Sequence, residues 1–429
     1  MIKLISGFFR KILSKNVYKK IRNIYFSIMI LLVGVSHRKL IDKIRKKNKI
    51  RVAFLVFDES VWKCKGVYDL FAKSGRYEPY ILICPIINLS KEESKLKTES
   101  CFRYFSEKDY EVYLAETSTE KLEKSDIVFF TNPHNITKPE YYSKLFFKKI
   151  CCYVPYSHQI SFYDNNYAQY DRPFHNLMWK IFAPQEQETK VFEEYSVNKG
   201  RNVVVSGYPG VEILMDEVDA PSVWKSQRTG VKKKVIWAPH HTIQNGKLKF
   251  SNFYSQAELI LKLSDKYKKE IQWCFKPHPL LFNNLIKDGV WSKSKVLSFY
   301  NSWQDSDYRQ TELGDYVEIF KQSDAMIHDS GSFLAEYLYT NKPVLHLAED
   351  EKVKDYLNEF GIECYNVCSK NKKGNTAIEP FLNEVIRGFD RQMDVRKKFV
   401  DSIKKRYFHS GSTPSLLIFN YIDEHINNN

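Results

Sequence analysis

Four polar clusters follow predicted strands and hold most of the side chains that could carry chemistry. The most specific cluster follows a strand expected at residues 325–327 and comprises Asp329, Ser330, Gly331, Ser332 and, further on, Glu336. A helix expected to begin near Ser332 would aim free backbone N–H groups at a ligand, as phosphate-binding helix starts do. Ser330 and Ser332 add hydroxyl donors, and Glu336, one helical turn later, could accept hydrogen bonds from a ribose. The cluster predicts a phosphate site, although Asp329 or Ser330 could simply cap the helix.

Two further clusters carry cationic and imidazole donors. The sequence WAPHHT at 237–242 places His240 and His241 on a strand-to-helix turn, where both can hydrogen-bond phosphate oxygens. In KPHP at 276–279 two prolines stiffen the backbone that carries Lys276 and His278. Preorganised donors of this kind suit a phosphate or diphosphate. Ordinary loop polarity is the alternative for both clusters.

The fourth cluster, residues 153–159, follows the last strong strand predicted for the first domain. His158 is expected to face the ligand cleft there. The pKa of an unperturbed histidine lies near neutrality, so His158 could act as a general base. A surface loop histidine is the alternative.

No metal or nucleotide-triphosphate motif is apparent. The histidines of the clusters lack the HxH or HxxxH spacing of compact metal sites, so no metal is expected. The chain has no GxxxxGK[ST] loop and no GxGxxG after its first strand, which argues against a P-loop NTPase or a simple dehydrogenase. Its eight cysteines form no CxxC pair and are expected to be reduced thiols.

The elements that position these clusters alternate between short apolar runs and helical patterns. This alternation predicts an α/β protein with two tandem Rossmann-like, doubly wound domains. The expected boundaries are a basic segment at 1–50, a first domain at 51–225, a second at 226–410 and a C-terminal helix at 411–429. Within the second domain, a long helix is expected from Thr376 to about Lys405. Ligands bind such sheets at the carboxyl ends of the strands, where all four clusters fall.

The formal net charge of +15 comes almost entirely from one segment. Residues 1–51 hold 15 Lys and Arg and one acidic residue, a net charge of +14, so the near-neutral body does not suggest nucleic-acid binding. Apolar pairs between Leu4 and Leu13 have helical spacing, and an apolar run follows at 24–35. The run is shorter than the roughly 20 residues of a membrane span. The segment therefore predicts a basic amphipathic helix on an anionic membrane surface, or else packing of the run on the protein body.

The clusters resemble those of the CDP-glycerol glycerophosphotransferase family, the teichoic acid and capsule polymerases with the GT-B fold. The resemblance covers about residues 125–425 and rests on WAPHHT, KPHP and the segment SDAMIHDSGSFLAEYLYTNKPVLHL at 323–347. Asp329, Ser332 and Glu336 match the family's D-x-S-S-x-x-x-D pattern, with Gly331 in place of one serine and Glu336 in place of the last aspartate. The family's His-Gly-Thr-Pro motif, which supplies its base, is replaced here by the residues around His158. Family members are also similar in having a membrane-associating N-terminal segment.

The resemblance implies a cofactor-independent transferase that moves glycerol phosphate from CDP-glycerol onto a polysaccharide or lipid-linked acceptor, as in capsule or teichoic acid synthesis. It would be a peripheral protein on the cytoplasmic face of the membrane. His158 would deprotonate the acceptor, Glu336 would hold the ribose, and His240 and His241 would lie near the diphosphate. Charge on the departing CMP would be stabilised by three groups, namely Lys276, His278 and the turn at 330–332.

Two alternatives remain open. One is a GT-B glycosyltransferase with a nucleotide sugar as donor for surface polysaccharide synthesis. The other is a non-catalytic membrane-bound scaffold of envelope assembly, which predicts that alanine in place of His278 or Asp329 leaves function intact.

Overall fold

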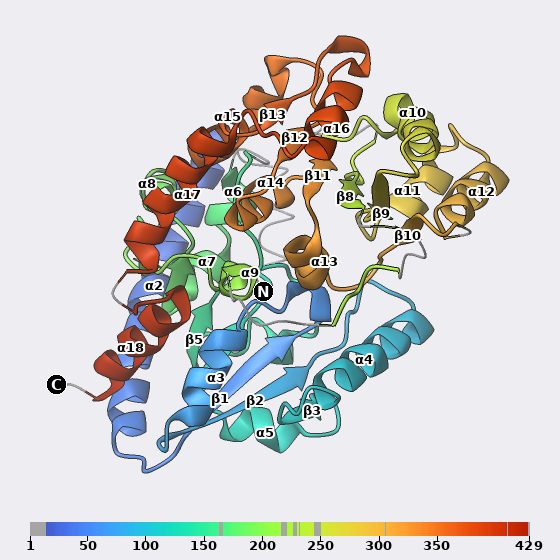
Figure 1. Ribbon diagram of the computed structural model, residues 1–429. Helices are drawn as coiled ribbons and strands as arrows, with labels where there is room; N and C mark the ends of the chain where they lie inside the picture. Colours follow the sequence, from blue (N-terminus) through green and yellow to red (C-terminus); the bar gives the residue numbers. More distant parts are fainter. Residues whose placement is uncertain are drawn as a thin grey trace. The chain divides into compact units, whose positions relative to one another are not determined.

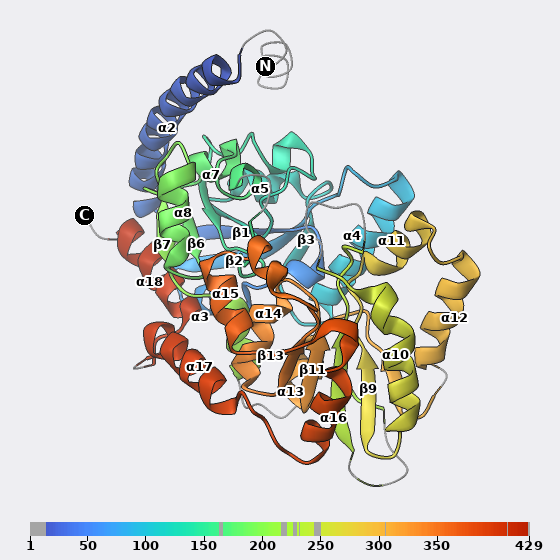
Figure 2. The same cartoon turned by 90° about the horizontal axis from the view of Figure 1, so that it is seen from above.

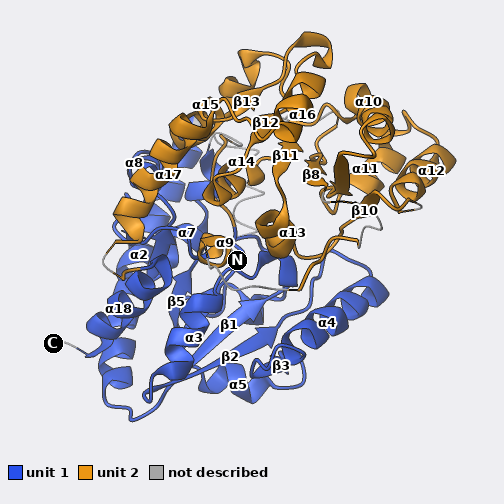
Figure 3. Cartoon of the chain, viewed as in Figure 1, with its two compact units in different colours: residues 1–156, 164–209, 413–429 blue, residues 157–163, 210–412 orange. Residues whose placement is uncertain are grey.

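The protein folds into two compact units. The computed structural model describes residues 14–162, 166–215, 221–225, 230, 232–243, 250–304, 306–409 and 411–427. Unit 1 contains residues 1–156, 164–209 and 413–429, and unit 2 contains residues 157–163 and 210–412 (Figure 3). The chain therefore enters unit 2 briefly after residue 156, returns to unit 1, and closes unit 1 with its last helix.

Unit 1 is built on a seven-stranded parallel sheet in the order β3-β2-β1-β4-β5-β6-β7 (Figure 1). The strands are β1 (Ile50–Val56), β2 (Tyr77–Ile83), β3 (Val112–Leu114), β4 (Ile127–Phe130), β5 (Ile150–Tyr153), β6 (Lys180–Ala183) and β7 (Val203–Val205). The central strands β1, β4 and β5 are nearly continuous apolar runs because helices cover both faces of a parallel sheet. The strand order reverses between β1 and β4, which makes the unit doubly wound.

The helices of unit 1 include segments from both ends of the chain. They are α2 (Lys15–Arg45), α3 (Lys65–Lys73), α4 (Lys91–Ser106), α5 (Thr119–Lys124), α6 (Tyr167–Tyr170), α7 (Pro173–Leu177), α8 (Gln187–Tyr195) and α18 (Pro414–Asn427). Ile418, Ile422 and Ile426 of α18 are fully buried in the core beside β1 and α3. The predicted C-terminal helix is thus part of the first unit's core, and Figure 3 shows it in that unit's colour.

Helix α2 is one continuous helix of 31 residues that packs on unit 1 through one face (Figure 2). Phe26, Val33 and Ile44 are buried on that face, and the His37 ring contacts the Phe146 carbonyl at 3.1 Å. By length and composition, residues 16–45 are long and apolar enough to cross a membrane, which the apolar run by itself did not suggest. The amphipathic repeat predicted at 4–13 lies outside the described residues.

Unit 2 repeats the doubly wound plan with a six-stranded parallel sheet in the order β10-β9-β8-β11-β12-β13. The strands are β8 (Lys233–Ala238), β9 (Ile271–Phe275), β10 (Arg309–Thr311), β11 (Ala325–His328), β12 (Val344–His346) and β13 (Ser369–Lys370). Its main helices are α9 (Glu212–Met215), α10 (Phe253–Lys266), α11 (Leu281–Asp288), α12 (Lys293–Gln304), α13 (Val317–Gln322), α14 (Phe333–Glu336), α15 (Glu359–Asn366), α16 (Ile378–Ile386) and α17 (Met393–Tyr407). The reversal of strand order lies between β8 and β11.

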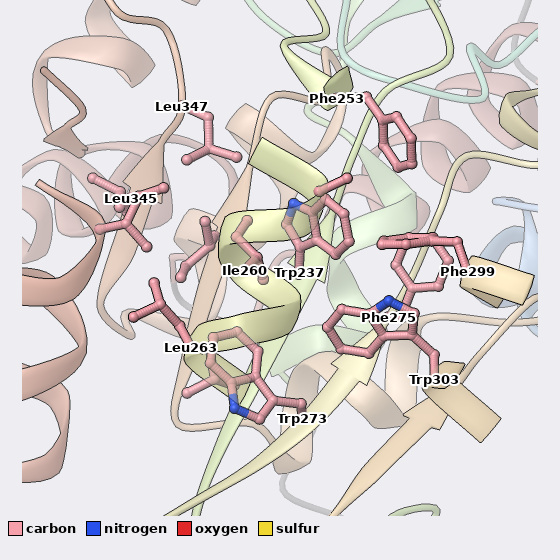
Figure 4. Close-up of a cluster of buried hydrophobic side chains, with 14 of the residues drawn as sticks. Trp237, Phe253, Ile260, Leu263, Trp273, Phe275, Phe299, Trp303, Leu345 and Leu347 are labelled. Atoms are coloured by element: carbon pink, nitrogen blue, oxygen red, sulfur yellow. The ribbon is translucent and has the colours of Figure 1, made fainter. Parts of the chain in front are cut away.

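Aromatic side chains dominate the core on one face of this sheet (Figure 4). Trp237 of β8 stacks on Phe253 of α10 and on Phe275 of β9, with ring centroids 5.8 and 5.0 Å apart. Trp303 of α12 stacks on Phe275 at 5.2 Å. Burying such rings removes a large apolar area from water and fixes the carboxyl ends of β8 and β9.

Two predicted helices differ from the structure. The long helix expected from Thr376 to Lys405 is two helices, α16 and α17, because Gly388 adopts a φ of 71° and ends the first one. The helix expected from Ser332 is the single turn α14, followed by a 3₁₀ segment at Tyr337–Thr340. Each unit has the expected alternation of parallel strands and helices, and the predicted α/β class with two Rossmann-like sheets is confirmed.

Candidate active site

Three histidines gather at the carboxyl ends of neighbouring strands of unit 2. His240 and His241 follow β8, and His278 follows β9. The ring centroids of His241 and His278 are 4.1 Å apart, those of His240 and His241 4.4 Å, and those of His240 and His278 5.2 Å. The group lies beside the reversal of strand order, where doubly wound sheets bind their ligands. Folding therefore joins two of the predicted clusters into one partly exposed histidine cluster.

Backbone and amide groups fix the tautomers of His278 and His241. The Leu280 N–H donates to His278 Nδ1 at 3.1 Å, so the ring proton of neutral His278 lies on Nε2. Asn284 Nδ2 on α11 lies 3.2 Å from His241 Nδ1 and donates to the His241 carbonyl at 3.0 Å. The second bond identifies that amide atom as nitrogen, so His241 Nδ1 is the acceptor and Nε2 again carries the proton.

His240 shows the same arrangement. Its Nδ1 accepts a long hydrogen bond from the Thr242 N–H at 3.4 Å and lies 2.9 Å from Thr242 Oγ1. Its Nε2 therefore carries the proton. The three side chains consequently present N–H donors through their Nε2 atoms.

Burial keeps these imidazoles uncharged at neutral pH. It lowers the pKa of His278 to about 3, with help from His241 and the positive Lys276. Burial also lowers the pKa of His241, and it holds the pKa of His240 well below the usual value, with the neighbouring histidines adding to the effect. The cluster thus offers neutral donors, which can bind an anion without the desolvation cost of buried charges.

By distance alone, the same cluster could hold a metal ion, because its ligand atoms all lie within 4.8 Å of one another. A metal needs a lone pair on the ligating nitrogen. The Nδ1 lone pairs of His278 and His241 already accept hydrogen bonds, and their Nε2 atoms carry protons. The hydrogen bonds therefore favour an anion over a cation.

Asp329, expected to contact the ligand or cap a helix, lies fully buried behind the histidines. Its Oδ1 accepts the His240 N–H at 2.6 Å, and its Oδ2 accepts the Asn252 N–H at 2.8 Å. Burial raises its pKa to about 7, against the opposing effect of these hydrogen bonds. The N-cap of α14 is Ser332, without a side-chain capping bond. Each carboxylate oxygen of Asp329 therefore accepts a hydrogen bond from a backbone N–H group.

The turn after Asp329 lies between the buried strand and α14. Ser330 is buried, and its N–H donates to His328 Nδ1 at 3.2 Å. Gly331 and Ser332 are partly exposed and remain accessible to a ligand. Because α14 is a single turn, its helix dipole contributes little, and the hydroxyl and backbone groups of the turn are the relevant donors.

Lys276 and Glu336 lie beneath this surface. Lys276 is 4% exposed, and its Nζ donates to the Gly314 carbonyl at 2.8 Å. Glu336 is 1% exposed and accepts a hydrogen bond from the Tyr316 hydroxyl. The contact of Glu336 with a ribose stays a prediction.

His158 lies in the segment that crosses into unit 2. Its Nε2 is 3.3 Å from the Tyr339 hydroxyl, and its ring stacks on the Tyr339 ring. The Asn358 N–H donates to the Ile160 carbonyl at 2.9 Å, which anchors the segment. A Cβ at Gly331 would lie 4.0 Å from Ile160 Cδ1, so this segment packs against the turn of the site. His158 was expected at the cleft face of the first domain, but it is buried in the second unit.

The residues that orient the histidines carry no sequence motif of their own. Asn284 lies on a helix that no motif marks, and only the fold places it beside His241. Thr242 is part of the WAPHHT motif, but residue type and spacing alone did not indicate that it orients His240.

His134 is a further histidine at the reversal of strand order, here in the sheet of unit 1. It follows β4, and its ring lies 6.5 Å from that of Tyr156. The sequence around His134 contains no recognisable motif of a ligand site.

A known protein family matches one part of the chain. Residues 156–368, about half of the chain, match the family model described as CDP-Glycerol:Poly(glycerophosphate) glycerophosphotransferase. No curated protein matches the chain in sequence.

Solved structures resemble the chain across both units. A histidine-to-alanine variant of the wall teichoic acid polymerase TagF is 14% identical, with a TM-score of 0.54 over 96% of this chain and 99% of that chain. A histidine-to-asparagine variant of TagF soaked with CDPG is 14% identical, with a TM-score of 0.51 over 96% and 98%. An S. aureus MnaA-UDP co-structure is 15% identical, with a TM-score of 0.50 over 88% and 97%. At these identities the likeness shows the fold alone, which is GT-B. The match over residues 156–368 goes further, and in this region the chain belongs to the CDP-glycerol glycerophosphotransferase family.

Proposed function

We propose that this protein transfers glycerol phosphate from CDP-glycerol onto a hydroxyl of a polysaccharide or lipid-linked acceptor. The observation that carries the proposal is the set of Nε2–H donors on His240, His241 and His278 at the strand reversal of unit 2. Three convergent neutral donors suit the oxygens of a diphosphate. The family match and the TagF structure soaked with CDPG support a cytidine-linked donor.

In the proposed reaction, the acceptor hydroxyl oxygen attacks the phosphorus of the glycerol phosphate group. The bond from that phosphorus to the bridging oxygen breaks, and CMP departs with the bridging oxygen and its electron pair. Negative charge then builds on CMP, where the histidine cluster and the turn at 330–332 donate hydrogen bonds. Preorganised donors stabilise such charge because they need no reorganisation during the reaction.

His158 is the proposed base that takes the acceptor proton. Support comes from its position inside the family match, which covers residues 156–368, and from the packing of its segment against Gly331. The Tyr339 hydroxyl at 3.3 Å from Nε2 orients the ring. The neutral imidazole of His158 has one ring nitrogen without a proton, and that nitrogen can take the proton of the acceptor hydroxyl.

The direct test is release of CMP when the protein is incubated with CDP-glycerol and a teichoic or capsular acceptor. We expect His278→Ala to abolish release, and Asn283→Asp, an exposed position on α11, to leave it intact. Release of UDP from a UDP-sugar, with no CMP from CDP-glycerol, would replace the proposal with the glycosyltransferase alternative, which the fold of MnaA-UDP also allows.

We further propose that α2 holds the protein on an anionic membrane surface. Of the eight exposed large apolar residues of α2, six recur at spacings of three and four and form one stripe: Val17, Ile21, Ile24, Ile28, Leu31 and Val35. The stripe lies opposite the buried Phe26 and Val33. Exposed basic residues lie near both ends of the stripe: Lys19, Lys20, Arg38 and Lys39. Apolar insertion flanked by lysine and arginine is the pattern of a helix that lies in the membrane interface.

Contacts along the buried face argue against a spanning orientation for α2. Arg22 pairs with the buried Asp171, and the Ser36 hydroxyl donates to the Phe147 carbonyl at 2.6 Å. A helix that crossed the bilayer would have to break these contacts and expose their polar groups to lipid. In flotation with vesicles containing phosphatidylglycerol, Leu31→Glu should reduce binding, whereas Leu297→Glu, at an exposed leucine on α12, should not. Equal binding by wild type and Leu31→Glu would contradict the assignment.

A further inference from the structure

One carboxylate joins the two ends of the loop that carries the histidines. This loop joins the end of β8 to the start of α10, and its described parts are residues 239–243 at one end and 250–252 at the other. Asp329 Oδ1 accepts the N–H of His240 at its start, and Oδ2 accepts the N–H of Asn252 at its end. The two acceptor distances are 2.6 and 2.8 Å, and the Asp329 side chain is fully buried. The Ser251 hydroxyl also bonds to this carboxylate.

Thr242 ties the same loop to the His240 ring. Its Oγ1 accepts the Phe250 N–H at 3.2 Å and lies 2.9 Å from His240 Nδ1. The Ser251 N–H donates to the Thr242 carbonyl at 3.3 Å. Closing the loop at its base therefore also sets the direction in which the His240 imidazole points.

We propose that Asp329 is a positioning residue whose carboxylate clamps both ends of the β8–α10 loop and thereby aims the Nε2–H groups of His240 and His241. A carboxylate is suited to this task because it offers two acceptor oxygens, one for each backbone donor. Asparagine has the same shape but offers one acceptor and one donor. In Asp329→Asn, one loop end would lose its bond and face an N–H group instead.

Burying the Asp329 carboxylate costs free energy, and its hydrogen bonds to the loop offset part of that cost. Burying an ionisable group away from water is unfavourable, and here burial raises the pKa of Asp329 to about 7. The backbone donors His240 and Asn252 oppose that rise. An apolar residue would avoid the cost but would leave two buried N–H groups without acceptors.

The clamp can be tested without any assumption about the reaction. Asp329→Asn is compared with Asp324→Asn, because Asp324 also accepts a backbone N–H, that of Lys234 at 2.8 Å, at the opposite end of β11. The first measurement is hydrogen exchange at the amides of His240 and Asn252. The second measurement is the NMR spectrum of the ring nitrogens of His240 and His241. A variant that is merely less stable would still show the native ring signals in its folded molecules.

We expect Asp329→Asn to speed exchange at one or both amides by about tenfold or more and to change the ring nitrogen signals. Asp324→Asn should change neither. Unchanged exchange and unchanged ring signals in Asp329→Asn, or equal changes in Asp324→Asn, would overturn the proposal.

Thr242→Val gives a second test that does not depend on the folding of Asp329→Asn. If Asp329 holds both ends, the amides of His240 and Asn252 stay protected when the Thr242 hydroxyl is removed. If both lose protection, Thr242 holds the loop and the proposal fails.

The effect on ligand affinity rests on the proposed function, and CDP is the probe. Asp329→Asn should weaken CDP binding about tenfold, the equivalent of one lost hydrogen bond. If wild-type protein fails to bind CDP, the proposed donor is wrong, while exchange and ring signals still decide whether Asp329 is a clamp.

Discussion

Replacing Asn284 with aspartate should reverse the tautomer of His241 and turn one of the anion donors into an acceptor. In the native protein Asn284 Nδ2 donates to the His241 carbonyl and to Nδ1, which leaves the proton on Nε2. A carboxylate at this position can only accept, so it draws the ring proton to Nδ1. The Nε2 lone pair would then face the bound phosphate.

The magnitude follows from the loss of one hydrogen bond to a charged ligand. Such bonds contribute about 1.5–3 kcal/mol, so CDP binding at pH 8.5 should weaken by roughly 10- to 150-fold. The new carboxylate also raises the pKa of His241, which burial lowers in the native protein. As the pH falls through that raised pKa, the imidazolium forms and Nε2 regains its proton. Affinity of the variant should therefore recover toward pH 6, relative to wild type at the same pH.

Isothermal titration with CDP at both pH values measures this effect. Asn283→Asp is the matched control, because it adds the same charge one residue away on α11, at an exposed position. An exposed charge changes binding by less than about 1 kcal/mol. Binding of CDP by Asn284→Asp at pH 8.5 within twofold of wild type, or an equal loss of affinity in Asn283→Asp, would show that Asn284 does not set the tautomer of His241.

Three further outcomes are expected. Saturation with CDP at 100 times its Kd should stabilise wild type by about 2.7 kcal/mol, and His278→Ala should lose most of that gain in a thermal shift assay; an undiminished shift would remove His278 from the site. Gly361→Ala should lower the free energy of unfolding by about 2 kcal/mol or more in urea, because its Cβ would lie 2.2 Å from the Ile160 carbonyl oxygen, and a more stable variant would contradict the packing of that segment. Burial lowers the pKa of His175 to about 3 and that of His346 to about 4, so the stability they confer is complete above about pH 6.5 and is lost as the pH falls toward those values. The urea midpoint should drop steadily from pH 7 to pH 4.5, and a flat profile would show that these rings are not buried in neutral form.

Strands with continuous apolar runs could be predicted from the sequence almost to the residue. The strand expected at 325–327 is β11 (Ala325–His328), which ends one residue later than expected. The edge strands β3, β10 and β13 escaped prediction, and two of them, β10 with the sequence RQT and β13 with the sequence SK, carry no apolar pattern. Such strands form because a neighbouring strand offers N–H and C=O groups for hydrogen bonding. The neighbour comes from another part of the chain, so the sequence of the edge strand alone does not predict the pairing.

Two doubly wound units, the family of residues 156–368 and the polar clusters after the strands could all be predicted before the fold was known. These depend on local apolar patterns and on short motifs, which a chain carries without folding. The folded chain was needed to show that Asp329 accepts hydrogen bonds from the histidine loop, that Asn284 sets the tautomer of His241, and that His158 lies in the second unit. These roles depend on hydrogen-bond partners distant in sequence, such as the Asp329 carboxylate and the His240 amide, 89 residues apart. Parallel strands bring such groups together by ending at the same edge of a sheet.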